Sequence, residues 1–124
     1  MHVTTTDRKS LGKKGEDIAC KALKKDRYKI IEKNYRCRQG EIDLIAEDRN
    51  RVLCFIEVKA KSSVSFGLPE EAVTGRKQKK IQAAAFSYFE SKGLKSRAMR
   101  FDVVAVDLVE KTSRTIKNAF EADM

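Results

Sequence analysis

Two short apolar runs lie near the middle of the chain and predict a pair of strands. Ile42 to Ala46 and Val52 to Val58 flank a polar stretch at residues 47–51. The second run is rich in β-branched and aromatic residues, which favour strands. Two such runs joined by a short polar connection are typical of an antiparallel hairpin. We therefore predict a β-hairpin over this part of the chain.

The residues before the hairpin predict one helix and one strand. Apolar residues recur at helical spacing from Leu11 to Leu23, and Ser10 precedes them as an N-cap, so a helix is expected from Ser10 to about Lys25. Residues 28–38 then predict an extended strand. Residues 1–9 are polar and are expected to form a mobile tail.

The residues after the hairpin predict a crossover to a parallel strand. Residues 62–69 contain serines, a glycine and the single proline, which indicates a loop. A helix is expected from about 75 to 92, with Gly93 as its C-cap. The apolar run at 99–108 then predicts a buried strand parallel to the second hairpin strand, and 112–117 a short edge strand.

These elements predict an α/β fold. A central mixed β-sheet, made of the antiparallel hairpin plus a parallel strand, would be flanked by helices. At 124 residues the chain is long enough for one core but not for two. We therefore expect a single domain over residues 10–120.

Charged residues interrupt the predicted hairpin on one face. Side chains alternate along a strand, so Asp43 and Glu41 share a face, as do Glu57 and Lys59. A turn centred near Asn50 would place Asp43 opposite Glu57 and Glu41 opposite Lys59, with Cβ atoms about 5 Å apart. A slip of one residue would send Asp43 to the other face of the sheet.

Two interpretations of these charges stay open. Opposed carboxylates repel each other, and a hard cation such as Mg²⁺, which is bound by one or two carboxylates, would remove that cost. Alternatively, Glu57 and Lys59 form an ordinary salt bridge on a solvated face and Asp43 takes no part. The strand pattern alone favours neither interpretation.

The net charge indicates a polyanionic partner. The chain has 27 Lys and Arg against 18 Asp and Glu, a net charge of +9. Such an excess on a small domain favours nucleic acid, although a membrane surface or no partner at all fits charge alone. No apolar stretch approaches the ~20 residues that span a bilayer, and the N-terminal residues lack a secretory signal. We expect a cytoplasmic protein without a membrane partner.

Cysteine and histidine usage narrows the chemistry of any hydrolase. The three cysteines have no metal-site spacing, and their odd number argues against a disulfide framework, so we expect them to be reduced. His2 is the single histidine, which excludes triads with a histidine base and argues against a histidine-based zinc site. A hydrolase would therefore depend on carboxylates and a metal.

Basic residues cluster at two further places. The first turns of the helix at 75–92 carry Arg76, Lys77, Lys79 and Lys80, where cations oppose the helix dipole unless a phosphate binds there. Arg36 and Arg38 alternate onto one face of the preceding strand, where they either contact phosphate or protect an edge strand. A solvated basic face is the alternative for the helix.

Several segments together resemble a known family. Gly40 to Ile45 and Glu57-Val58-Lys59 resemble the PD-(D/E)xK nuclease signature. More narrowly, the chain is similar to the YraN family of uncharacterised bacterial proteins, which are similar to archaeal Holliday-junction resolvases. The further matching segments are Gly12 to Glu16, Asn34-Tyr35-Arg36, Phe55 to Lys59, Glu71-Ala72-Val73 and Phe101 to Val104.

The resemblance implies a restriction-endonuclease-like fold and a metal-dependent nuclease. Asp43 and Glu57 would hold Mg²⁺ or Mn²⁺, with the Val58 carbonyl as a third ligand. Lys59 would position water or stabilise the transition state, and Glu16 would complete the site from the first helix.

The resemblance also implies that the substrate is nucleic acid, in the first place DNA, with branched or junction DNA included. Backbone contacts would come from Arg36, Arg76, Lys77 and Lys80. Junction resolution needs two coordinated cuts and hence a two-fold homodimer, for which Val64, Phe66 and Leu68 are the candidate surface. A non-catalytic nucleic-acid-binding module that acts with a partner, and an RNA substrate, are the alternatives.

Overall fold

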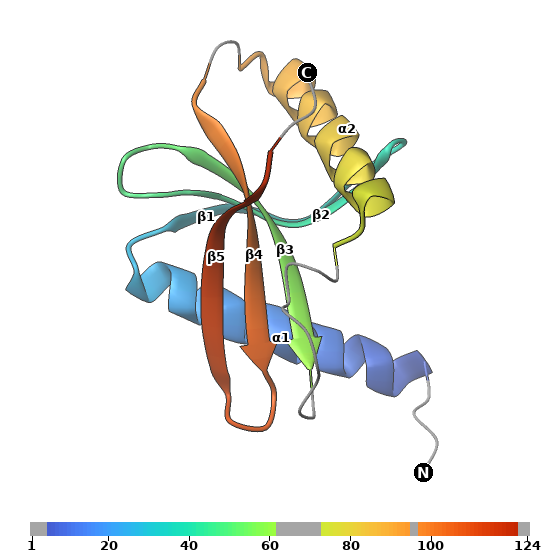
Figure 1. The fold of residues 1–124 in the computed structure, drawn as a ribbon, viewed down its shortest axis with the longest axis vertical. Coiled ribbons are helices and arrows are strands. Elements are labelled where there is room, and N and C mark those ends of the chain that lie inside the picture. Colours follow the sequence, from blue (N-terminus) through green and yellow to red (C-terminus); the bar gives the residue numbers. More distant parts are fainter. Residues whose placement is uncertain (1–4, 62–72, 95–96, 122–124) are drawn as a thin grey trace.

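A computed structural model describes residues 5–61, 73–94 and 97–121, with side chains from residue 12 onward. It contains five strands and two helices (Figure 1). In chain order these are α1 (Thr5–Lys25), β1 (Lys29–Cys37), β2 (Gly40–Glu47), β3 (Leu53–Lys61), α2 (Gly75–Lys92), β4 (Met99–Asp107) and β5 (Thr112–Phe120).

The five strands form one mixed sheet in the order β1-β2-β3-β4-β5. Strands β3 and β4 are parallel, and the other neighbouring pairs are antiparallel. The predicted α/β fold, with a hairpin, a parallel strand and flanking helices, is confirmed. The predicted edge strand is also present as β5, but it continues to Phe120 because it pairs with β4 as far as Phe101.

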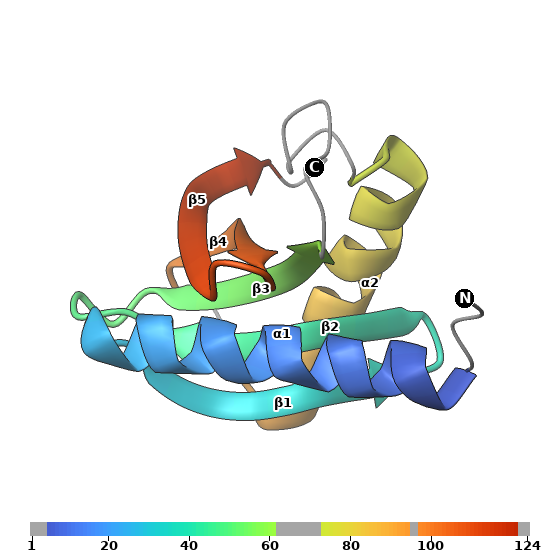
Figure 2. The ribbon, with the colours of Figure 1, turned by 90° about the horizontal axis from the view of Figure 1, so that it is seen from below.

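The two helices cover opposite faces of the sheet (Figure 2). Leu23 of α1 packs with Ile56 on one face, whereas Tyr88 of α2 packs with Phe55 on the other. Consecutive residues of β3 thus point into different cores, as alternation along a strand requires. Burial on both faces explains the continuous apolar run that predicted this strand.

Helix α1 begins earlier than predicted. It starts at Thr5 rather than Ser10, so the expected tail at residues 1–9 is helical over its second half. No proline or glycine lies between Thr5 and Ser10, so an existing helix extends backwards at low cost. Neither α1 nor α2, within the residues described, is long and apolar enough to cross a membrane.

Helix α2 has the ends that the sequence predicted. The Thr74 hydroxyl accepts a hydrogen bond from the Lys77 backbone N–H at 3.2 Å, and Gly93 ends the helix in the left-handed conformation with φ 64°. The Gln78 side chain donates to the Val73 carbonyl at 2.9 Å. These bonds fix the backbone of the first helical turn.

A buried ionic network lies beneath the β2–β3 turn. Arg100 Nε donates to both carboxylate oxygens of the fully buried Asp102, at 3.0 Å each, and Asn118 N donates to Asp102 at 3.0 Å. The Arg100 guanidinium also contacts Asp48 at 2.6 Å and the Tyr28 hydroxyl at 2.7 Å. Asp102 is thus satisfied by an arginine and by the backbone.

The cysteines are free, as predicted. Cys20 and Cys54 are buried and Cys37 is half-buried. Burial raises the pKa of the Cys54 thiol to about 12, with the Asp102 carboxylate adding to the effect. Cys54 is therefore a packing residue rather than a nucleophile.

The approach of α1 to β3 depends on Gly15. A Cβ at position 15 would lie 2.6 Å from the Ala60 Cβ, whereas a Cβ at Gly12 would meet nothing within 4 Å. We expect Gly15→Ala to lower the free energy of unfolding by about 1–3 kcal/mol. Gly12→Ala should raise it by up to ~1 kcal/mol through helix propensity. Urea denaturation checks both, and equal effects of the two substitutions would contradict this packing.

Candidate active site

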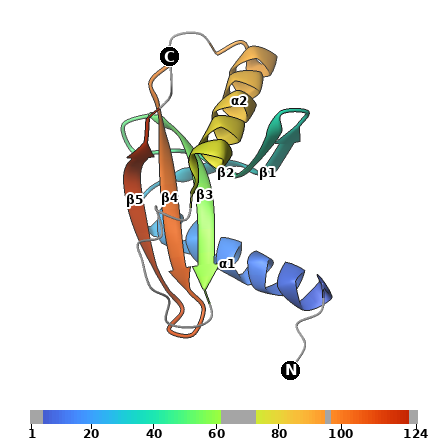
Figure 3. The same ribbon diagram turned by 45° about the vertical axis from the view of Figure 1, so that its right-hand side comes forward.

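The strand register places Asp43 at the end of the β2–β3 ladder. Leu44 pairs with Ile56 and Glu47 with Leu53, as expected for a turn near Asn50. The predicted register is therefore confirmed over the paired residues. Beyond Leu44 and Ile56 no further pair forms, and the β1–β2 hairpin diverges toward α2 (Figure 3).

The ladder pairings predicted for Asp43 with Glu57 and for Glu41 with Lys59 are both wrong for this reason. Glu41 lies beyond the last β2–β3 pair and instead faces Arg36 of β1. Their side chains form an exposed ion pair with 3.2 Å between Arg36 Nε and Glu41 Oε2. The prediction extended a regular ladder past the point where the two strands separate.

Asp43 bridges the opening between the separated strands. Its Oδ2 accepts a hydrogen bond from the Val58 backbone N–H at 2.8 Å. Burial and the neighbouring Glu57 carboxylate raise the pKa of Asp43 to about 7, Glu16 adds to the rise, and the Val58 N–H opposes it. Asp43 and Glu57 are thus close enough to repel each other, although they are not a ladder pair.

Glu57 is buried and forms ion pairs with two lysines. Its side chain is 6% exposed, and its Oε1 lies 2.8 Å from Lys77 Nζ and 3.9 Å from Lys59 Nζ. The pKa of Lys59 is lowered by burial and by the nearby Lys77. For Lys77, burial acts to lower the pKa, but the bond to Glu57 outweighs it and the net shift is upward. The closer counter-ion of Glu57 therefore comes from α2.

Glu16 approaches the site from α1 and is held by Asn34. The Asn34 Nδ2 donates to Glu16 Oε1 at 3.1 Å. Asn34 has φ 53°, a left-handed conformation that asparagine adopts more readily than most residues. Among the described residues, however, no three His, Cys, Asp or Glu side chains are grouped closely enough to hold a metal. The structure assembles Asp43 and Glu57, with Glu16 further out.

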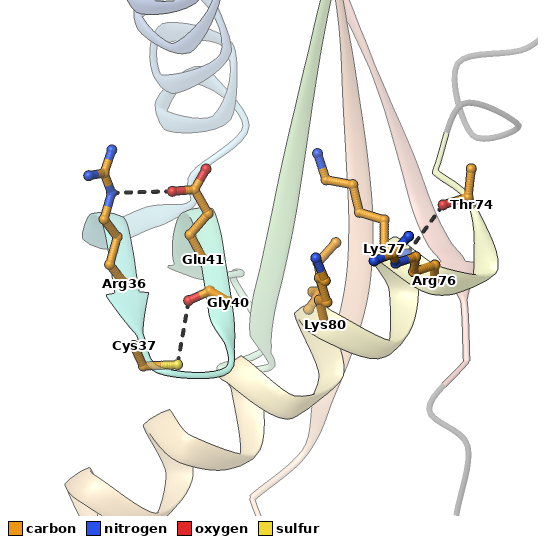
Figure 4. Close-up of a pocket in the computed structure, with 9 residues that line it drawn as sticks. Arg36, Cys37, Gly40, Glu41, Thr74, Arg76, Lys77 and Lys80 are labelled. Atoms are coloured by element: carbon orange, nitrogen blue, oxygen red, sulfur yellow. Dashed lines mark hydrogen bonds and ion pairs between the residues drawn. The ribbon is translucent and has the colours of Figure 1, made fainter.

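A basic cleft of about 760 Å³ adjoins these carboxylates. It lies between the β1–β2 hairpin and the start of α2 (Figure 4). The hairpin approaches α2 closely, since a Cβ at Gly40 would lie 3.1 Å from the Lys80 carbonyl oxygen. The residues that line the cleft are Arg36, Cys37, Gly40, Glu41, Thr74, Arg76, Lys77, Lys80 and Ile81.

The cleft brings together the four basic residues to which backbone contacts were assigned, whereas Arg38, also considered for phosphate, does not line it. Arg36 comes from the β1–β2 hairpin, and Arg76, Lys77 and Lys80 come from α2. These two segments are far apart in sequence. Lys77 belongs to both parts of the site, because it lines the cleft and its ammonium contacts Glu57. The carboxylates and the cleft are therefore adjacent.

Comparison with known proteins places the chain in a family. Residues 15–106 match the model of the uncharacterised protein family UPF0102. The chain belongs to this family. UPF0102 proteins of Geobacter sulfurreducens and of Caldanaerobacter subterraneus are 41% and 46% identical to it, over 91% and 92% of this chain and 90% and 97% of theirs. The resemblance to the YraN family, which is UPF0102, is confirmed.

Two contacts in this UPF0102 protein were not predicted. The sequence assigned Lys77 to phosphate and gave no indication of its ion pair with Glu57. It also gave no indication that Asn34 bonds Glu16. Both contacts join a helix to a strand distant in sequence, so they depend on how the helices dock. The loop at 62–69, with Val64, Phe66 and Leu68, lies outside the described residues.

The raised pKa of Asp43 predicts a pH-dependent effect on stability. The folded state binds this proton more tightly than the unfolded state, whose carboxyl has a pKa near 3.8. The free energy of unfolding of the metal-free protein should therefore fall as pH rises from about 4 to about 7. Asp43→Asn should remove this fall and stabilise the protein by about 2 kcal/mol at pH 8 but hardly at pH 4.

Urea denaturation of the metal-free protein at the two pH values measures this difference. Glu110→Gln, which removes an exposed carboxylate in the β4–β5 connection, is the control and should change stability little at either pH. A gain from Asp43→Asn that is the same at pH 4 and pH 8 would show that Asp43 ionises normally.

Proposed function

We propose that this UPF0102 protein is a nuclease that hydrolyses phosphodiester bonds in DNA with the help of Mg²⁺ or Mn²⁺. The observation that carries the proposal is the pair of close carboxylates, Asp43 and Glu57, beside a basic cleft that is lined in part by Lys77, the ion-pair partner of Glu57. Acidic groups that hold a cation and basic groups that hold phosphate are the two requirements of metal-assisted phosphodiester hydrolysis.

The donor atoms fit a hard divalent cation. Asp43 and Glu57 provide carboxylate oxygens, and burial together with the Glu57 charge raises the pKa of Asp43, so a nearby cation would favour its ionised form. Mg²⁺ is commonly held by one or two carboxylates together with water and substrate phosphate. The Val58 carbonyl is the proposed third protein ligand. When bound, the cation would activate water and neutralise charge on the phosphate.

Lys59 and Glu16 would have further roles in the reaction. Lys59, on the same face of β3 as Glu57, would orient the attacking water or stabilise charge on the phosphate. Glu16, held by Asn34, would support the site from α1. The placement of these groups supports the PD-(D/E)xK assignment that the sequence suggested.

The cleft favours recognition of the nucleic-acid backbone. Its basic residues, Arg36, Arg76 and Lys80, suit phosphate, and none of the residues that line it is aromatic. Stacking on bases is therefore not supplied by this part of the described surface. Contacts of this kind fix position rather than read sequence, which is consistent with a structure-selective enzyme. Such an enzyme acting on junctions would work as a homodimer.

A non-catalytic nucleic-acid-binding module is the second candidate. It is favoured by the absence of a third clustered ligand in the described part of the chain. The buried Glu57 and the half-buried Asp43 beside the cleft count against it, because these carboxylates repel phosphate and contribute nothing to binding. We therefore place the nuclease first.

Cleavage assays test the proposal directly. Purified protein should cut labelled four-way junction, flap, duplex or single-stranded DNA with Mg²⁺ or Mn²⁺ and not with EDTA. Asp43→Asn and Glu57→Gln should each lower the rate by at least ~10²–10³-fold, because each removes a charge that acts in the transition state. Glu110→Gln, which makes the same chemical change far from the cleft, should cut normally.

The pattern of results separates the candidates. Undiminished cutting by folded Asp43→Asn protein would disprove the assigned site. RNA substrates of the same shapes are assayed beside the DNA. If neither the DNA nor the RNA substrates are cut, the binding module is favoured. Gel-shift binding in the same samples confirms that the substrates reach the protein.

The basic cleft makes a separate prediction about salt. Arg76→Gln and Lys80→Gln should each weaken DNA binding about equally on all sequences. Each should also reduce the slope of log affinity against log salt by about one. Lys79→Gln, on the same helix but outside the cleft, serves as the charge-matched control. Fluorescence anisotropy over a salt series measures the slopes. Equal slopes for all three variants would show that DNA does not bind in this cleft.

A further inference from the structure

We propose that Lys77 is a movable counter-ion that couples the two halves of the site. In the metal-free protein it neutralises Glu57, and when Asp43 and Glu57 take a divalent cation it moves into the adjoining cleft and binds a backbone phosphate. The inference rests on the proposed function, because it needs both the cation and the nucleic acid.

The geometry permits this movement without a change in the fold. Lys77 Nζ is 2.8 Å from Glu57 Oε1, yet the Lys77 side chain is 44% exposed whereas that of Glu57 is 6% exposed. The Lys77 backbone is held by Thr74, so rotation within its flexible four-carbon side chain is sufficient. Figure 4 shows this side chain extending from the first turn of α2 toward β3, at the edge of the cleft.

The balance of charge supplies the driving force. When Asp43, Glu57, Lys59 and Lys77 are all ionised, their charges sum to zero. A divalent cation on the two carboxylates would add two positive charges beside two ammonium groups, which repel it. A nucleic-acid backbone in the cleft would supply compensating negative charge next to Arg76.

Lys77 rather than Lys59 is the residue free to leave. Lys59 is less exposed, at 23%, and projects from β3 itself beside Glu57. Lys77 is nearly twice as exposed and already lines the cleft that would receive it. Its departure removes one positive charge from the carboxylates and adds one to the phosphate-binding surface.

The movement predicts reciprocal coupling. The ion pair with Glu57 competes with the cation, so Lys77 should weaken metal affinity in the absence of DNA. A partly exposed pair contributes about 1 kcal/mol, which corresponds to roughly a fivefold loss of apparent affinity. Bound DNA, by holding Lys77 in the cleft, should in turn strengthen metal binding by the same factor that metal strengthens DNA binding.

Metal affinity in the absence of DNA is the first test. Titration calorimetry with Mn²⁺ should give Lys77→Met roughly fivefold tighter binding than the wild type. Lys79→Met removes an equal charge from the same helix outside the cleft and should match the wild type. Lys77→Arg keeps the cation and should also match it. Thermal melting confirms that each variant is folded.

DNA affinity with and without a divalent cation is the second test. Relative to the wild type, Lys77→Met should lose several-fold more DNA affinity in Ca²⁺ than in EDTA, where Lys77 is held by Glu57. Lys80→Met, whose side chain lines the cleft and has no ion pair with Glu57, should bind more weakly in both. Gels run after the measurement confirm that the DNA is intact.

The outcomes separate this inference from the proposed function. If the wild type binds Mn²⁺ but Lys77→Met binds no tighter, or loses DNA affinity equally in EDTA and Ca²⁺, the movement of Lys77 is wrong and the nuclease proposal stands. If neither wild type nor Lys77→Met binds Mn²⁺, the metal site fails and both proposals fall. Tighter Mn²⁺ binding together with metal-dependent loss of DNA affinity establishes the coupling.

Discussion

The register between β2 and β3 is the constraint on which the candidate site depends, and it is fixed at the opposite end of the hairpin. Asp48 accepts hydrogen bonds from the backbone N–H groups of Asn50 and Val52, both at 2.9 Å, and also contacts Arg100. Arg100 is in turn held by the buried Asp102 of its own strand. A slip of one residue would disturb these bonds and would turn every side chain of β2 to the other face.

The other end of the hairpin has the opposite energetic character. There the ladder stops, and Asp43 takes the Val58 N–H that a further strand pair would have used. The nearby carboxylate of Glu57 makes this arrangement unfavourable for the ionised pair, and Lys59 and Lys77 offset part of that cost. One end of the hairpin thus stabilises the fold, and the other places two close carboxylates next to a cleft. Local cost of this kind is typical of functional sites.

The sequence predicted the elements and the register well because both follow from local patterns. Alternation placed Asp43 and Glu57 on one face, and the polar stretch around Asn50 located the turn. The sequence did not predict where the ladder ends, because strand separation depends on the docking of the β1–β2 hairpin against α2. The Lys77–Glu57 contact eluded prediction for the same reason. The early start of α1 was missed because its first residues carry no apolar periodicity.

The presence of two ammonium groups on one buried glutamate bears on the choice between enzyme and binding module. The phosphate affinity of a binding surface is raised by free lysines and lowered by nearby carboxylates. An ion pair between Lys77 and Glu57 would therefore weaken such a surface. A metal-dependent enzyme gains from the same contact, because Lys77 keeps the carboxylates compatible with the fold until a cation replaces it. Glu57 already has counter-ions, so the protein can fold without metal. Proteins with a structural metal site differ, because they need the metal in order to fold. The combination is therefore better explained by a site in which cation and substrate bind together.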